Sequence, residues 1–213
     1  MAKLYPYWSP ILLCHILANS LMAALNRSIY QSIWIPLRLA LIMVLFYLVQ
    51  TYLQVELRFL ANVPRTLEGL VGIVFAPLVH VSLFHLLSNL FPLLCLGTVV
   101  YWFYGRIASA VFLRCYFVPQ VLVWLFARPQ LHVGSSGLVY GLAFFLIFLG
   151  FFRKDFKSLF VSIMILLFFG GLFYGILPNH HGISWESHLA GVVAGGMSAF
   201  EYSKKGSERP NAD

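Results

Sequence analysis

Apolar residues along this chain gather in long continuous runs separated by short polar segments, rather than in the stripe of an amphipathic helix. A helix needs about 20 consecutive apolar residues to cross the hydrocarbon of a bilayer, and several of these runs approach that length. We predict six membrane-spanning helices, over residues 36–55, 84–103, 107–127, 136–152, 159–177 and 188–202.

A weaker apolar run at residues 11–25 contains His15, Asn19 and Ser20. It is compatible with either an interfacial helix or a seventh span, and its polar content favours the interfacial helix. We therefore predict an all-α polytopic membrane protein with three parts: an N-terminal extension at 1–35, a membrane domain at 36–203 and a polar cytoplasmic tail at 204–213.

Composition supports a membrane protein and argues against a nucleic-acid partner. Hydrophobic residues make up 61% of the chain and charged residues only 10%, compared with about 25% charged residues in ordinary soluble domains. All seven acidic residues fall between the runs or at their ends. Most of the basic residues behind the net charge of +7 stand singly or in short clusters between the runs, as membrane topology requires.

The distribution of these basic residues predicts the orientation of the chain. One set of loops and flanks holds Lys3, Arg27, Arg38, Arg106, Arg153, Lys154, Lys157, Lys204, Lys205 and Arg209, and the opposite loops hold only Arg58, Arg65 and Arg128. Because cytoplasmic loops carry the excess of Lys and Arg, both termini are expected in the cytoplasm. The helix ends that carry Ser136 and His188 then face the extracytoplasmic side.

Ser136 and His188 are candidates for a nucleophile and its base. Polar groups at membrane depth are costly and are functional candidates by default, and a serine hydroxyl needs a base such as histidine to accept its proton. Ser136 lies in the segment Gly134-Ser135-Ser136-Gly137 at the start of a predicted helix, where free N–H groups favour an oxyanion. Glu186 is too close in sequence to orient His188, so we predict a dyad rather than a triad.

His85 and Asn89 are expected to support the same chemistry. They are four residues apart, so they lie on one helix face, about 40° from eclipsed. Two such donors could stabilise the oxyanion of a tetrahedral intermediate, an effect of about 3 to 4 kcal/mol per donor.

Small residues predict which helices come together. Gly137 and Gly141, and likewise Gly191 and Gly195, form two small-xxx-small patterns that permit close helix contact. This contact would bring Ser136 and His188 together. Tyr140 lies one turn after Ser136 and would be able to pack against the imidazole.

Taken together, these motifs resemble those of the rhomboid family of intramembrane serine proteases. His85-Leu86-Leu87-Ser88-Asn89 is similar to the family's H-x-x-x-N motif, Gly134 to Gly137 to its G-x-S-G motif, and His188-Leu189-Ala190-Gly191 to its last-helix histidine motif. The order and helix assignments agree over residues 36–202. The resemblance implies a six-helix rhomboid-like bundle that cleaves transmembrane protein substrates in the bilayer, in a bacterial inner (cell) membrane, without a cofactor.

The resemblance also implies individual roles. Ser136 would be the nucleophile and His188 the base, with the oxyanion hole formed by His85, Asn89 and the backbone N–H of Ser136; Tyr140, Gly134 and Gly137 would support the site, and His80 would bridge loop and helix. Two segments depart from the family pattern. Residues 70–73 replace a Trp-Arg pair in the first outward loop, and residues 101–103 replace a Glu-x-Arg motif. These departures concern how that loop is anchored and how substrate enters.

Two alternatives use the same residues. A transporter or metal site would use His80, His85, His132, His180, His181 and His188, but the sequence has no H-E-x-x-H motif and no carboxylate within the runs, so no metal is expected. A non-catalytic rhomboid-like protein would bind membrane proteins on the same scaffold. Because both Ser136 and His188 are present, catalysis is favoured over binding alone.

Overall fold

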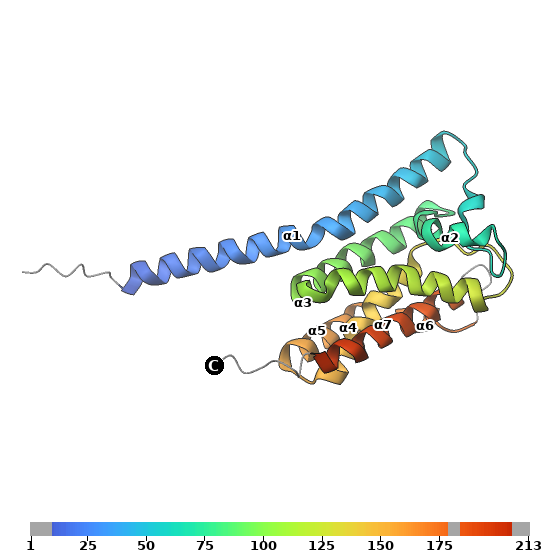
Figure 1. Cartoon of the computed structure of the whole chain (residues 1–213). Helices are drawn as coiled ribbons and strands as arrows, with labels where there is room; N and C mark the ends of the chain where they lie inside the picture. Colours follow the sequence, from blue (N-terminus) through green and yellow to red (C-terminus); the bar gives the residue numbers. More distant parts are fainter. Residues whose placement is uncertain (1–9, 179–183, 206–213) are drawn as a thin grey trace, which may run out of the picture.

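The computed structural model describes residues 10–178 and 184–205, with side chains over residues 29–178 and 184–204. The regular elements in these ranges are helices, and no β-strand is found among them (Figure 1). In chain order they are α1 (Pro10–Tyr52), η1 (Arg58–Leu60), α2 (Gly69–Phe75), η2 (Ala76–Leu78), α3 (Leu83–Phe126), α4 (Ser136–Arg153), α5 (Phe156–Phe169), α6 (Leu172–Gly175) and α7 (Trp185–Lys205).

Three of the described helical segments are long and apolar enough to cross a bilayer. They are Ile29–Tyr52, Leu83–Phe126 and Ser136–Arg153, and Gly69–Leu78 and Phe156–Phe169 are shorter apolar helices. The chain is therefore an all-helical integral membrane protein.

The 44 residues of α3 form two arms rather than one straight rod. Tyr104 leaves the helical conformation, with φ −130° and ψ 32°, and the rings of Tyr101 and Phe112 on either side of it are 5.9 Å apart. The Lys157 ammonium donates to the freed carbonyl of Phe103 at 2.8 Å. The chain thus doubles back at Tyr104, and the two arms correspond to the apolar runs predicted at 84–103 and 107–127.

The core is centred on α4, which α3, α5 and α7 surround (Figure 1). Glycines bring α4 and α7 into close contact as the sequence predicted. A Cβ added to Gly191 would collide with the carbonyl oxygen of Gly137, and one added to Gly195 would collide with that of Gly141. This glycine interface (Gly137, Gly141, Gly191 and Gly195) holds the start of α7 beside the start of α4.

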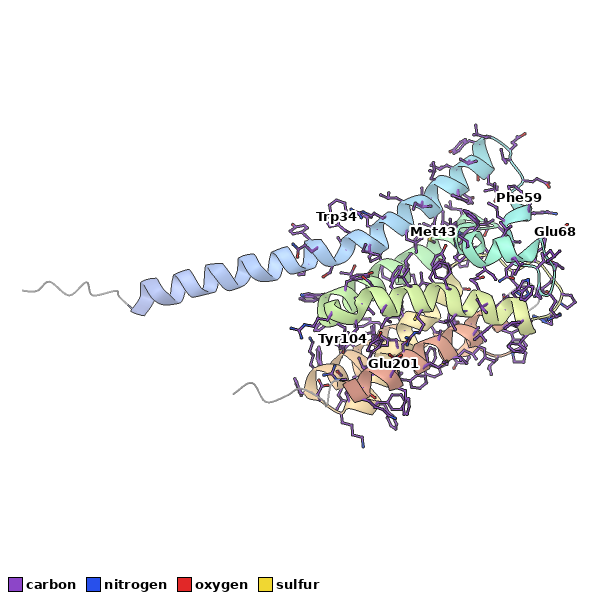
Figure 2. The ribbon with its side chains drawn as sticks, viewed as in Figure 1. Trp34, Met43, Phe59, Glu68, Tyr104 and Glu201 are labelled. Atoms are coloured by element: carbon purple, nitrogen blue, oxygen red, sulfur yellow. The ribbon has the colours of Figure 1, made fainter. Side chains whose placement is uncertain are left out.

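The first helix packs on one side only. Met43 of α1 is fully buried, whereas Trp34 is 54% exposed (Figure 2). The run at 11–25 does not form a separate helix, because α1 begins at Pro10 and continues through Pro36. The domain boundary at 35 and 36 stays a prediction, and residues 206–213 of the expected tail lie outside the described residues.

The prediction of one continuous helix at 159–177 is wrong. Helix α5 ends at Phe169, and the short helix α6 follows only after Gly170 and Gly171. Two consecutive glycines weaken a helix because each loses more conformational entropy than any other residue. The break brings the carbonyl of Gly175 to the neighbourhood of α7.

The segment between α1 and α3 is anchored by hydrogen bonds to the second arm of α3 and to the loop after it. Asn62 forms an isolated antiparallel bridge with His132, and the Asn62 amide donates to the carbonyl of Gln120 at 2.8 Å. Further bonds run from Trp124 to the Thr66 carbonyl at 2.9 Å and from Tyr116 to the Val74 carbonyl at 2.7 Å. These contacts fix the loop that lacks the expected Trp-Arg pair.

Candidate active site

Ser136 is the first residue of α4 and is half-buried. The helix begins here because the N–H of Val139 bonds to the carbonyl of Ser135 at 3.1 Å. The N–H groups of the first turn therefore have no intrahelical acceptor, and they carry the positive end of the helix dipole. This geometry places a hydroxyl beside donors that suit a developing negative charge.

Both the backbone conformation at position 134 and its closeness to His85 require glycine. Its φ of +101° lies in the region that residues with a side chain rarely adopt. A Cβ at this position would also lie 2.7 Å from both Cε1 and Nε2 of His85. The loop before Ser136 can therefore approach His85 only with glycine here. Gly137, in turn, faces Pro119 and the Ser187 carbonyl, which a Cβ would meet at 3.0 and 3.2 Å.

His188 lies in the first turn of α7 and is only 8% exposed. Its Nδ1 is 2.8 Å from the carbonyl oxygen of Gly175. A carbonyl can only accept, so Nδ1 carries the proton and Nε2 of the neutral ring is an acceptor. The Tyr140 ring stacks on the imidazole with centroids 4.0 Å apart and planes 5° from parallel, as the sequence led us to expect.

The first turns of α3 supply His85 and Asn89. Asn89 is buried, and one N–H of its amide donates to the His85 carbonyl at 2.8 Å, which leaves its second N–H for another acceptor. The His85 ring meets the ring of His80 edge-on, with centroids 5.0 Å apart.

His80 lies behind the site and is fully buried. Its backbone carbonyl accepts a hydrogen bond from Gln50 of α1 at 3.3 Å, so it links the loop before α3 to the first helix. Burial, and secondly the neighbouring His85, lower the pKa of His80 to about 4. The ring is therefore neutral at physiological pH.

A cavity of about 550 Å³ joins the candidate residues. Its wall includes Ser136, His188, His85, Asn89 and Tyr140. The remaining lining residues are Val81, Phe84, Ser88, Gln130, Leu131, Val133, Val139, Leu172 and Ser184. Among the described residues no hydrogen bond joins Ser136 to His188, whose ring bonds instead to Gly175. The cavity therefore gathers a hydroxyl, an acceptor nitrogen and several donors, with room for a peptide segment.

Two residues of the site were not predicted from the sequence. Gly175 orients His188 through its backbone, which no side-chain motif reveals, although Gly170 and Gly171 signal the helix break before it. Ser184 precedes α7, and its hydroxyl accepts from the Ser187 N–H at 3.3 Å as a helix cap.

No group of three or more His, Cys, Asp or Glu side chains in the described ranges is arranged to hold a metal ion. His180 and His181, which the metal-site alternative used, lie outside those ranges.

The sequence matches the family model of the rhomboid domain over residues 67–205. The chain therefore belongs to the rhomboid family. It is 34% identical over 179 residues to an uncharacterized protein of Mycobacterium leprae, and the match covers 74% of this chain and 67% of that protein. It is 32% identical over 160 residues to an uncharacterized protein of Mycobacterium tuberculosis, and the match covers 64% of this chain and 61% of that relative's length.

Proposed function

We propose that this rhomboid-family chain is an intramembrane serine endopeptidase that cleaves transmembrane proteins through a dyad of Ser136 and His188. The observation that carries the proposal is the state of His188: its Nδ1 is committed to the Gly175 carbonyl, so Nε2 is the acceptor on a cavity wall that also carries Ser136. A neutral imidazole fixed in this tautomer is the base that a serine nucleophile needs.

The proposed reaction follows from the remaining groups. Ser136 attacks the scissile carbonyl while His188 takes its proton, and the new oxyanion is held by the Ser136 N–H, the free N–H of Asn89 and His85. Each such donor contributes about 3 to 4 kcal/mol in well-studied enzymes. His188 then gives its proton to the leaving amine, and water resolves the acyl-enzyme by the same route. No metal or cofactor takes part.

We also propose how the chain sits in the bilayer. Six spans would be provided by α1, the two arms of α3, α4, α5 together with α6, and α7. Helix α4 runs from Ser136 at the cavity to Arg153, and the basic residues Arg153, Lys154 and Lys157 cluster at this far end. By the positive-inside rule that end is cytoplasmic, so both chain ends are cytoplasmic and the cavity opens to the extracytoplasmic side of a bacterial inner membrane.

The test is labelling of the purified protein in proteoliposomes with a fluorophosphonate probe, followed by cleavage of a model transmembrane substrate. Ser136→Ala and His188→Ala should each lower both rates by at least about a thousandfold, because the two groups act as a unit. Ser135→Ala is the matched control: this neighbouring serine is fully buried and its hydroxyl has no partner among the described residues. It should retain both activities.

Equal labelling of wild type and Ser136→Ala would refute the proposed nucleophile. A folded wild-type protein that neither labels nor cleaves would favour the non-catalytic rhomboid-like scaffold instead. A chelator in the assay should leave the rates unchanged.

A further inference from the structure

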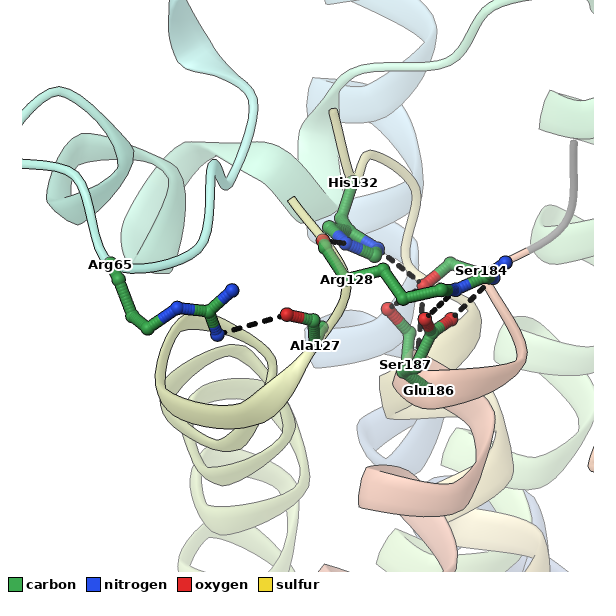
Figure 3. Close-up of polar contacts among 7 residues, drawn as sticks. All are labelled: Arg65, Ala127, Arg128, His132, Ser184, Glu186 and Ser187. Carbon is green, nitrogen blue, oxygen red and sulfur yellow. Dashed lines mark hydrogen bonds and ion pairs between the residues drawn. The ribbon is translucent and has the colours of Figure 1, made fainter. Parts of the chain in front are cut away.

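A buried histidine outside the dyad connects the loop between α3 and α4 to the start of α7. His132 is 1% exposed, its Nε2 lies 3.0 Å from the carbonyl oxygen of Arg128, and its Nδ1 lies 2.7 Å from the hydroxyl of Ser184 (Figure 3). Ser184 in turn contacts the Ser187 hydroxyl at 2.7 Å. Ser187 is the residue before His188.

The Arg128 carbonyl determines the donor and acceptor of every hydrogen bond in the series that runs from it through His132 and Ser184 to Ser187. The Arg128 carbonyl can only accept, so Nε2 of His132 carries the proton and Nδ1 accepts from the Ser184 hydroxyl. The Ser184 oxygen then accepts from both the hydroxyl and the backbone N–H of Ser187. Burial, the largest influence, lowers the pKa of His132 below its ordinary value even though Glu186 and Arg128 also act on it. A neutral ring is what this arrangement requires.

An ion pair joins the same two segments a short distance away. The Arg128 guanidinium binds both carboxylate oxygens of Glu186, with Nη2 to Oε2 at 3.1 Å (Figure 3). It also lies over the ring of Trp185, 5.8 Å from its centroid. The Glu186 side chain is only 11% exposed. Two connections, one neutral and one charged, therefore reach consecutive residues of the first turn of α7.

The position of this turn decides where the His188 ring lies. The backbone N–H of His188 bonds to the Ser184 carbonyl at 3.4 Å, so the capped turn and His188 move together. On the other side, the Ser187 carbonyl lies 3.2 Å from where a Cβ of Gly137 would be, one residue from Ser136. A misplacement of about 1 Å can cost a factor of about 100 in rate.

We propose that His132 is a positioning residue for the dyad: through Ser184 it holds the first turn of α7, and with it His188, in register with Ser136. The inference rests on the proposed protease function and names a residue that acts through His188 without touching substrate.

The experiment compares His132→Leu with His132→Asn by active-site titration. Probe labelling gives two quantities, the fraction of molecules that react and the rate constant of those that do. Asparagine can place its amide oxygen where Nδ1 accepts from Ser184, whereas leucine cannot. We expect His132→Leu to lower the rate constant of the reactive molecules about 10- to 100-fold, and His132→Asn to restore most of it.

Arg65→Gln is the matched control. Arg65 donates to the carbonyl of Ala127 at 2.9 Å, so it anchors the same loop on the side away from α7 (Figure 3). Its loss should lower thermal stability without changing the rate constant. The proposal is overturned if His132→Leu lowers only the reactive fraction, as a purely structural role would, or if Arg65→Gln slows the reaction equally.

Hydrogen exchange separates this inference from the protease proposal. The peptide covering residues 184–190 should exchange faster in His132→Leu than in wild type, and in Arg65→Gln it should not. If wild type does not label at all, the protease function fails, and this exchange alone decides whether His132 holds the turn. Unchanged exchange in His132→Leu would refute the proposal that His132 holds the first turn of α7 through Ser184.

Discussion

Helices α4 and α5 are adjacent and similarly apolar, yet they have opposite surroundings. In α4, Leu142, Phe145 and Leu146 are completely buried. In α5, Phe156 and Phe168 are 86% and 79% exposed on the outside of the helical bundle. Hydropathy therefore identifies both as apolar helices, but it does not distinguish a central helix from a peripheral one.

Small residues account for the difference. Gly141 and Gly150 let other elements approach α4 closely: a Cβ at Gly141 would lie 2.8 Å from Cβ of Cys115 in α3, and one at Gly150 would collide with Ser162 in α5. Helix α5 buries only one stripe, made of Ser158, Val161, Ser162 and Ile165, which is the i, i+3, i+4, i+7 spacing of a single helix face. The spacing of small residues is thus more informative than hydropathy about which helix is central.

Truncating a phenylalanine in each helix is the strongest test of this contrast. Phe145→Ala should lower the free energy of unfolding by about 3 to 5 kcal/mol, because it leaves a cavity in the core. Phe168→Ala should change it by less than about 0.5 kcal/mol, because that side chain is exposed and packs against little of the protein. Thermal or denaturant unfolding in one detergent measures both, and similar losses would contradict the difference in burial.

Adding one methyl group tests the glycine interface. Gly191→Ala would press its methyl against the Gly137 carbonyl, and a backbone atom cannot rotate away. We expect a loss of about 1 to 3 kcal/mol and slower probe labelling. Gly105→Ala is the control, since a Cβ there would meet nothing within 4 Å. A Gly191→Ala protein as stable as Gly105→Ala would show that α4 and α7 are not in close contact.

A pH titration extends the comparison of buried and exposed side chains to His80, which is buried in the loop before α3. The pKa of His80 is lowered from 6.5 to about 4 by its burial. The unfolded chain therefore binds the proton more readily, so the stability from neutral His80 is present above about pH 6.5 and is lost as the pH falls through 4. The melting temperature should fall over this range, and less steeply in His80→Asn. Parallel curves for the two proteins would exclude His80 as a source of the effect.

Features with a local spacing were predictable from the sequence. The two arms of α3 follow from two separate apolar runs. The glycine interface and the stacking of Tyr140 on His188 follow from spacings of a few residues. Arg114 lies within the apolar run at 107–127, where a charged side chain needs a partner. The structure gives it Glu201 of α7 at 2.7 Å, a residue that spacing alone does not single out.

Features that depend on backbone carbonyls or on distant loops were not predictable. The orientation of His188 comes from the Gly175 carbonyl, and every residue type offers the same backbone carbonyl. The connection from His132 to Ser184 spans 52 residues, and an isolated histidine in a loop carries no signal of its partner. The continuation of α1 through Pro36 was missed because proline usually marks a helix start.

The use of the Gly175 carbonyl also affects the free energy of inserting this protein into a bilayer. An ionised carboxylate in that position would have to be desolvated, at a cost of several kcal/mol. The carbonyl dipole fixes the imidazole while adding no net charge. The candidate site can therefore assemble among apolar helices without a buried counterion, and the translocation machinery has no extra anion to move across the hydrocarbon.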